Sequence, residues 1–136
     1  MRRLLLGCTC ALLAGCAATP AAVEPPRPDA PPEEVVAVLV EAINARDADV
    51  LPFVATPVEA GNIEAIWFGT RFTELEVDPA APVPVPAGAP FQVDVHVDAV
   101  LENTDGSFPE GELVGCGYRL VQQDDGRWLV TEQGVG

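Results

Sequence analysis

The stretch Phe91–Leu101, "FQVDVHVDAVL", alternates apolar and polar side chains over its whole length. A period of two predicts a β-strand with one face on a hydrophobic core and the other face in water. The polar face carries Gln92, Asp94, His96 and Asp98. A half-buried strand of this length needs partner strands and a second layer over its apolar face, so we expect a sheet that is covered on one side.

Three further segments have strand character. In residues 73–78, Thr73, Leu75 and Val77 alternate with three acidic residues, and residues 112–122 form another apolar-rich run. Asp125-Gly126 is a hairpin turn signal that precedes a returning strand over residues 127–133. The sequence therefore predicts an antiparallel sheet of about four strands.

The segment before these strands has the period of a helix. Within Glu33–Arg46, the apolar residues Val36, Leu39, Val40 and Ile43 recur at i, i+3, i+4 and i+7. This spacing predicts an amphipathic helix whose apolar stripe faces the core.

Two shorter helices are expected to follow. Asp47 is a candidate cap for a helix over residues 48–55, which Pro52 shortens or kinks. The segment Thr56–Glu59 has the spacing of a capping box and starts a third helix, which Gly61 is expected to interrupt. The predicted fold is therefore α+β, with two or three N-terminal helices packed on a curved antiparallel sheet.

The N-terminus has the layout of an export signal. Two arginines precede the apolar run Leu4–Gly15, whose twelve residues are too few to cross a hydrocarbon core that needs about 20. The run ends in Leu13-Ala14-Gly15-Cys16, which resembles the lipobox of bacterial lipoproteins. The resemblance implies cleavage between Gly15 and Cys16 and a diacylated Cys16. An ordinary secretory signal is the alternative.

These features divide the chain into a signal peptide (1–15), a lipidated Cys16 with a spacer (16–32), and a folded domain (33–136). Residues 17–32 hold six prolines and little apolar bulk. That composition predicts a disordered, semi-rigid spacer that reaches roughly 50 Å. The expected location is extracytoplasmic, anchored by lipid to the bacterial cell membrane, or to the outer membrane of a diderm.

The charge of the chain argues against nucleic acid as a partner. Of seven Lys and Arg residues, two precede the cleavage site, and 21 Asp and Glu residues follow it, so the part from Cys16 onward has a formal charge of −16. Such a surface repels nucleic acid and anionic lipid headgroups. We therefore expect the acyl chains on Cys16 to make the membrane contact.

The folded part resembles the nuclear-transport-factor-2-like superfamily, which includes SnoaL-like proteins. The likeness rests on the opening helix followed by "NARDADVLPFVA" (Asn44–Ala55), on the order of helices before sheet, and on the closing hairpin "DDGRWLVTEQGV" (Asp124–Val135). The resemblance implies a cone-like, cystatin-like fold that encloses a pocket. Enzymes of the family place Asp, His or Tyr in that pocket, but the fold alone does not imply catalysis.

The polar face of the central strand holds the single histidine of the chain. Asp94, His96 and Asp98 follow one another at about 7 Å per step, a spacing that allows a shared metal ion or proton. A metal site would need further ligands, and a general base would need a sheltered cleft. We interpret the three residues as a solvated sheet face or a polar dimer surface, with metal binding and catalysis as alternatives.

Tyr118 is the leading candidate for a pocket, because it brings a hydroxyl to an apolar strand face. Trp67, Phe72 and Trp128 are candidates to line the same cavity, and the alternative is aromatic packing within the core. Cys116 is expected to be a small buried hydrophobe.

We predict a non-catalytic envelope lipoprotein that binds a small apolar ligand or a protein partner and needs no cofactor. One alternative is a SnoaL-like isomerase or dehydratase that uses Tyr118 with a buried carboxylate. The other is an accessory subunit whose sheet face docks on an envelope complex or on a second copy as a homodimer.

Overall fold

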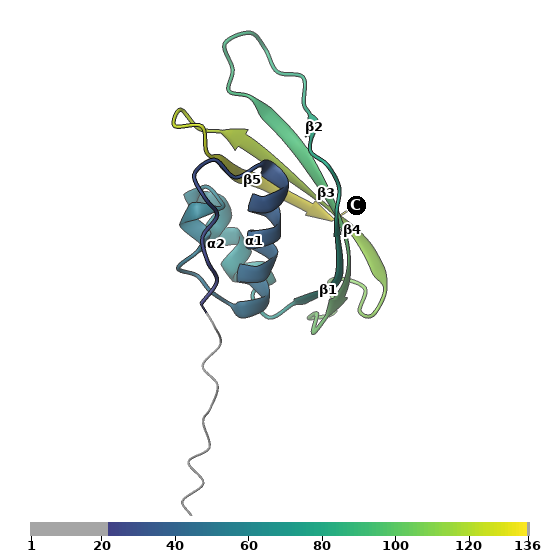
Figure 1. Cartoon of the computed structure of the whole chain (residues 1–136). Helices are drawn as coiled ribbons and strands as arrows, with labels where there is room; N and C mark the ends of the chain where they lie inside the picture. Colours follow the sequence, from purple (N-terminus) through teal and green to yellow (C-terminus); the bar gives the residue numbers. More distant parts are fainter. Residues whose placement is uncertain (1–21, 136) are drawn as a thin grey trace, which may run out of the picture.

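A computed structural model describes residues 22–135 and contains two helices followed by an antiparallel sheet of five strands (Figure 1). The elements are α1 (Pro32–Ala45), the 3-10 turn η1 (Leu51–Phe53), α2 (Pro57–Trp67), β1 (Arg71–Val77), β2 (Ala81–Pro82), β3 (Gln92–Glu102), β4 (Leu113–Gln122) and β5 (Trp128–Val135). The prediction of an α+β fold is therefore confirmed.

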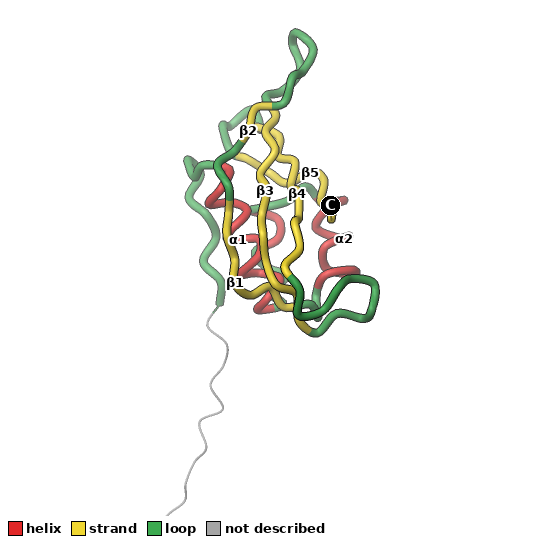
Figure 2. The backbone as a smooth tube through the Cα atoms, turned by 90° about the vertical axis from the view of Figure 1, so that its right-hand side faces the viewer, coloured by secondary structure: helices red, strands yellow, loops and turns green. Residues whose placement is uncertain are grey.

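The sheet is open and has the strand order β1-β3-β4-β5, with the two-residue β2 pairing to β3 beyond the end of β1. The helices cover one face of the sheet, and the other face is free of them (Figures 1 and 2). We call the free side the outer face. The alternation predicted for β3 is confirmed, because Val93, Val95, Val97, Ala99 and Leu101 are all buried under the helices.

The first helix supplies most of the covering layer. Its apolar residues Val36, Leu39, Val40 and Ile43 are almost completely buried, as the helical period predicts. The helix ends at Arg46, which adopts left-handed backbone angles (φ 53°, ψ 41°). The Asn44 amide then joins α1 to β1, donating to the Phe72 carbonyl (2.9 Å) and accepting from the Phe72 N–H (2.8 Å).

Several local predictions are wrong. The helix expected over residues 48–55 is only the turn η1, and α2 runs through Gly61 without interruption. The side chain of Thr56 makes no capping hydrogen bond, and Glu59, its expected capping partner, is 92% buried. In β1, a bulge between Thr73 and Glu76 breaks the expected alternation and leaves Leu75 exposed.

Residues 22–31 lie on the domain, where a spacer free of contacts was expected over residues 16–32. The chain runs antiparallel to α1, from the C-terminal end of the helix back to its start (Figure 1). The Val23 N–H donates to Asp47 Oδ2 (3.1 Å), and Ala30 is buried against the core. Composition favoured disorder, but prolines also lower the entropy lost on ordering, so one buried alanine and one hydrogen bond help to hold this segment.

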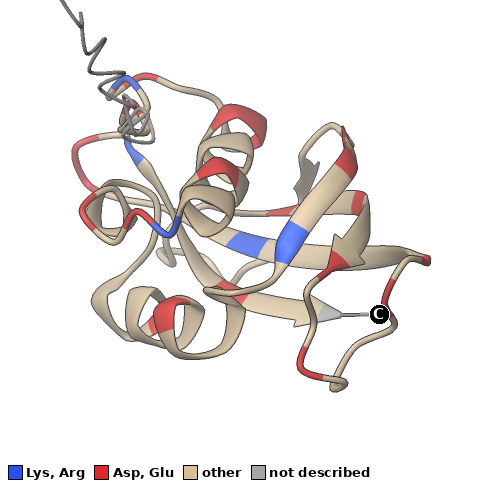
Figure 3. Cartoon of the chain, turned by 90° about the horizontal axis from the view of Figure 1, so that it is seen from below, with Lys and Arg blue, Asp and Glu red and all other residues tan. Residues whose placement is uncertain are grey.

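The signal peptide, the cleavage site and Cys16 lie outside the described residues. Within residues 22–135, none of the helices has the length and apolarity needed to cross a membrane. Acidic residues are spread over helices, strands and loops, and arginines are few (Figure 3). The domain therefore presents a strongly acidic surface.

Candidate functional site

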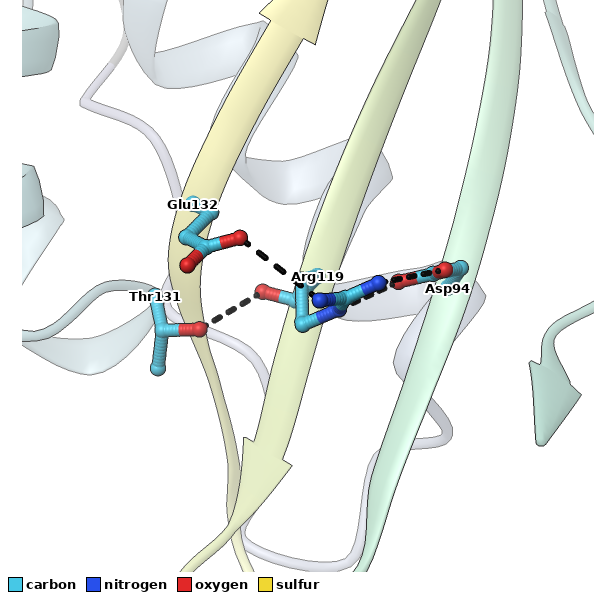
Figure 4. A network of polar contacts seen from close by, with 4 residues as sticks. All are labelled: Asp94, Arg119, Thr131 and Glu132. Carbon is cyan, nitrogen blue, oxygen red and sulfur yellow. Dashed lines mark hydrogen bonds and ion pairs between the residues drawn. The ribbon is translucent and has the colours of Figure 1, made fainter. Parts of the chain in front are cut away.

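The outer face of the sheet carries a row of charged side chains across three strands. Asp94 on β3 lies opposite Arg119 on β4, and Arg119 lies opposite Glu132 on β5. Arg119 Nε and Nη2 donate to the two carboxylate oxygens of Asp94 at 2.9 and 3.0 Å, and Arg119 Nη1 lies 3.8 Å from Glu132 (Figure 4). The hydrogen bond to Asp94 raises the pKa of Arg119. The guanidinium is thus held between two carboxylates.

The next row has almost no side chains. His96 on β3 lies opposite Gly117 on β4, which lies opposite Gly134 on β5. A Cβ atom built on either of these glycines would have no heavy atom within 4 Å. Two neighbouring strands therefore expose bare backbone at this point.

His96 leans away from this bare patch. Its Nε2 lies 3.1 Å from Asp98 Oδ1, and its Cε1 would lie 2.7 Å from a Cβ built on Gly115. The imidazole therefore covers Gly115 and leaves Gly117 open. The side chains of His96 and Asp98 are 50% and 39% exposed, as the interpretation of a solvated face predicts.

These two rows form a groove of about 550 Å³. The segment after β1 closes one side of it, where the Asp78 N–H donates to the His96 carbonyl (2.9 Å). The charged residues and glycines that line the groove, together with His96, are Asp78, Asp94, Gly117, Arg119, Glu132 and Gly134. A volume of this size suits a small ligand or a few residues of a peptide.

Sequence reasoning placed Asp94, His96 and Asp98 on this face but missed Arg119 and the glycines. The alternation through Cys116 and Tyr118 already puts Gly117 and Arg119 on the opposite side of β4. A glycine inside a strand can mark a place where a ligand or another backbone approaches closely. That signal was available in "GCGYRL".

The three candidate metal ligands do not converge. Asp94 is bound to Arg119, and Asp98 is bound to His96. Among residues 22–135, no group of three or more His, Cys, Asp or Glu side chains has the geometry to hold a metal ion.

The four aromatic residues expected to line one pocket lie in three different places. Trp67 stacks on Phe108, with ring centroids 4.7 Å apart, and also contacts Phe72 at 5.6 Å. Trp128 packs edge-on against Phe91 at the other end of the sheet and borders a separate pocket of about 170 Å³. Tyr118 lies between them, completely buried.

Tyr118 is part of a small polar cluster inside the core. Its hydroxyl accepts a hydrogen bond from Gln133 Nε2 (3.0 Å), while Gln133 Oε1 is buried without a partner among the described residues. Burial, and to a smaller extent the neighbouring Cys116 and Glu59, raise the pKa of Tyr118 far above its usual range. The phenol is therefore neutral at any physiological pH.

Glu59 is the buried carboxylate that the sequence reasoning did not find. It points inward from α2 and accepts a hydrogen bond from Asn62 Nδ2 (3.3 Å). Its charge makes a small contribution to the raised pKa of Tyr118. The missed signal was its phase on α2, because Glu59, Ile63 and Trp67 lie four residues apart on one helix face.

No protein-family model matches this sequence, and no curated protein matches it. Among solved structures, the intermembrane-space region of the chloroplast protein ARC6 has a TM-score of 0.42 and 16% sequence identity, over 76% of this chain and 92% of that chain. No conclusion about family or function follows from a likeness at this level.

Proposed function

We propose that the protein is an extracytoplasmic lipoprotein, anchored through Cys16, whose domain binds a partner in the outer-face groove without catalysing a reaction. The observation that carries the binding role is the pair of facing glycines, Gly117 and Gly134, which leave backbone open between charged side chains. Neither glycine has a positive φ, so the backbone does not require glycine there. A glycine inside a strand costs roughly 0.5–1 kcal/mol relative to alanine, so its presence is consistent with a need for open space.

The docked segment at residues 22–31 supports a role close to the membrane. Since Val23 is held by Asp47, the connection from the lipidated Cys16 to this contact has seven Cα–Cα steps. Seven steps reach at most about 25 Å in any conformation. The domain of this lipoprotein therefore stays near the bilayer, with the C-terminal end of α1 toward it.

The family resemblance remains part of this proposal. Helices before the sheet, a curved sheet around them and the closing hairpin all suit a small nuclear-transport-factor-2-like cone (Figure 1). In this chain, large side chains such as Tyr118 and Leu120 fill the space between sheet and helices. This packing favours ligand binding on the outer face over binding inside the cone.

A second candidate function is a pocket enzyme that uses Tyr118 and Glu59. The specific observation in its favour is the inward polar cluster, with the unpaired Gln133 Oε1 beside the phenol. The high pKa of Tyr118 suits it as a neutral hydrogen-bond donor, not as a group that loses its proton.

The test is native mass spectrometry of the full-length protein, purified in mild detergent from its own membrane. We expect the mass of a diacylglycerol group on Cys16 and a bound partner that Gly117→Val removes and Tyr118→Phe retains. Cys16→Ser should release the protein from the membrane fraction. A wild-type protein without lipid would overturn the anchor, and loss of the bound molecule in Tyr118→Phe alone would favour the enzyme.

A further inference from the structure

The outer face of the sheet carries more acidic side chains than basic ones. Six carboxylates lie on it or at its edge, and they face two arginines and one histidine. The acids are Glu76, Asp78, Asp94, Asp98, Glu102 and Glu132, and the cations are Arg71, Arg119 and His96.

The two cationic groups that line the groove are already engaged. Arg119 makes two hydrogen bonds to Asp94 and lies near Glu132. His96 lies at hydrogen-bond distance from Asp98. The groove is therefore a poor receptor for an anion and a good one for a positively charged group, which can reach Asp78 and Glu132 at opposite sides of the groove.

The floor of the groove also limits the shape of the ligand that can bind. Gly117 and Gly134 lie side by side between the Asp94–Arg119–Glu132 row and the His96–Asp98 pair. Because no side chain rises from them, a ligand backbone or an aliphatic stem can lie flat on the sheet and bring its charge to the carboxylates.

From this arrangement we infer that the groove binds an extended segment of a protein partner that carries lysine or arginine side chains. This inference rests on the proposed function and specifies its ligand. A peptide uses both kinds of group in the groove, because its side-chain cations meet the carboxylates and its carbonyls accept from the unused donors of Arg119. A polyamine has no acceptor for those donors. A second copy of this chain, also at a formal charge of −16, is repelled.

The test measures fluorescence anisotropy with the lipidated full-length protein in detergent. The probes are a labelled peptide alternating lysine and serine, the same peptide with glutamate for lysine, and spermidine as a competitor. We expect the basic peptide to bind with a Kd below about 1 mM, more weakly at higher salt, and the acidic peptide not to bind.

Two variants locate the site, and a third is the control. Gly117→Val puts a β-branched side chain into the open floor, where the built Cβ has no neighbour within 4 Å, so the fold is kept while the groove is filled. It should weaken binding by at least about tenfold, as should the double change Asp78→Asn with Glu132→Gln. The matched control is Gly61→Ala on the exposed surface of α2, which also has open space and should leave binding unchanged.

The inference is overturned by any of four results: no binding of the basic peptide up to about 1 mM, equal binding of the acidic peptide, full binding by Gly117→Val, or binding of spermidine in place of the peptide. These outcomes are separate from failure of the proposed function. One result would separate the two: the lipidated protein carries a bound partner that Gly117→Val removes, but it does not bind basic peptides. This result would support the proposed function and overturn the inference.

Discussion

The two buried ionisable residues of β4, Cys116 and Tyr118, hold their protons at neutral pH. Cys116 is fully buried, and burial together with the charge of Asp98 raises the pKa of its thiol to about 11. Tyr118, two residues away, has its pKa raised mainly by burial. Neither side chain is a nucleophile at neutral pH, because the reactive form of a cysteine is the thiolate.

Cys116 should therefore report on unfolding. At pH 8 we expect no labelling of the folded protein by a maleimide, and complete labelling in concentrated urea. The folded thiol keeps its proton up to about pH 11, whereas the unfolded thiol loses it near 9.0. This contribution is present below pH 9 and is lost as the pH rises through 11, which lowers the unfolding free energy by about 2–3 kcal/mol.

The control for this pH dependence is Cys116→Ala, which keeps the alkaline titration of Tyr118 but lacks the thiol. Urea unfolding at pH 8 and pH 10.5 should show a smaller loss of stability in the variant than in the wild type. Equal losses in the two proteins would mean that Cys116 is accessible to water in the folded state.

At the scale of elements, the C-terminal end of α1 is joined to neighbouring segments by several hydrogen bonds. The first helix ends in the left-handed residue Arg46, with the Asp47 N–H donating to the Ala42 carbonyl (2.9 Å). The side chain of Asp47 then accepts from two backbone groups, Asp49 N–H and Val23 N–H, both at 3.1 Å. Two adjacent residues thus close α1 and hold the N-terminal segment.

Arg46→Gly should stabilise the protein by about 1 kcal/mol, because glycine adopts left-handed angles without the clash of a Cβ atom. Thermal and urea unfolding measure the change. Arg46→Ala is the matched control, since it removes the same charge but keeps the Cβ, and it should give no gain. A gain of equal size in both variants would assign the effect to charge instead of backbone conformation.

Asp47→Ala should free the segment at residues 22–31 and cost about 1–2 kcal/mol, because it removes an acceptor from two backbone donors. Hydrogen exchange should show the Val23 amide exchanging at least about tenfold faster. Glu64→Ala, which removes an exposed acid from α2, is the control and should leave that amide unchanged. Unaltered exchange in Asp47→Ala would show that proline packing alone holds the segment.

At the scale of the whole molecule, the domain has two different ends and two different faces. The N-terminal segment begins beside the C-terminal end of α1, and the loop between β2 and β3 lies at the opposite end (Figure 1). The groove lies on the outer face of the sheet. The helices, with the N-terminal segment along α1, lie on the other side of the sheet (Figure 2). An anchor on Cys16 would therefore leave the groove accessible from the side.

This orientation can be measured with lipidated protein on liposomes. Dyes attached through Asp49→Cys and Ala87→Cys mark the two ends, and the buried Cys116 thiol should not react at neutral pH. We expect stronger energy transfer to a lipid dye from position 49, because the seven-step connection keeps that end within about 25 Å of the bilayer. Equal transfer from both positions would show that the docked segment does not orient the domain.

Local sequence patterns predicted the buried faces of α1 and β3 well. They predicted the side-chain contacts within and between elements poorly. The alternation of β3 and the helical period of α1 were enough to assign their buried faces. The predicted capping box at Thr56–Glu59 does not form. Glu59 lies on the buried face of α2, and its side chain does not bond back to the start of the helix. Which face of α2 is buried depends on how the helix packs on the rest of the domain. Gly61 did not interrupt α2, because packing of Ile63 and Trp67 outweighs its low helix propensity.

The sequence by itself determined the α+β order, the acidic charge and the face on which Asp94, His96 and Asp98 lie, because these depend on composition and on the period of neighbouring side chains. Only the tertiary structure decided that Arg119 binds Asp94 and that Gly117 faces Gly134. Strand register brings together residues far apart in the chain, and it is set by packing against the helices and by the turns, so no local pattern contains it.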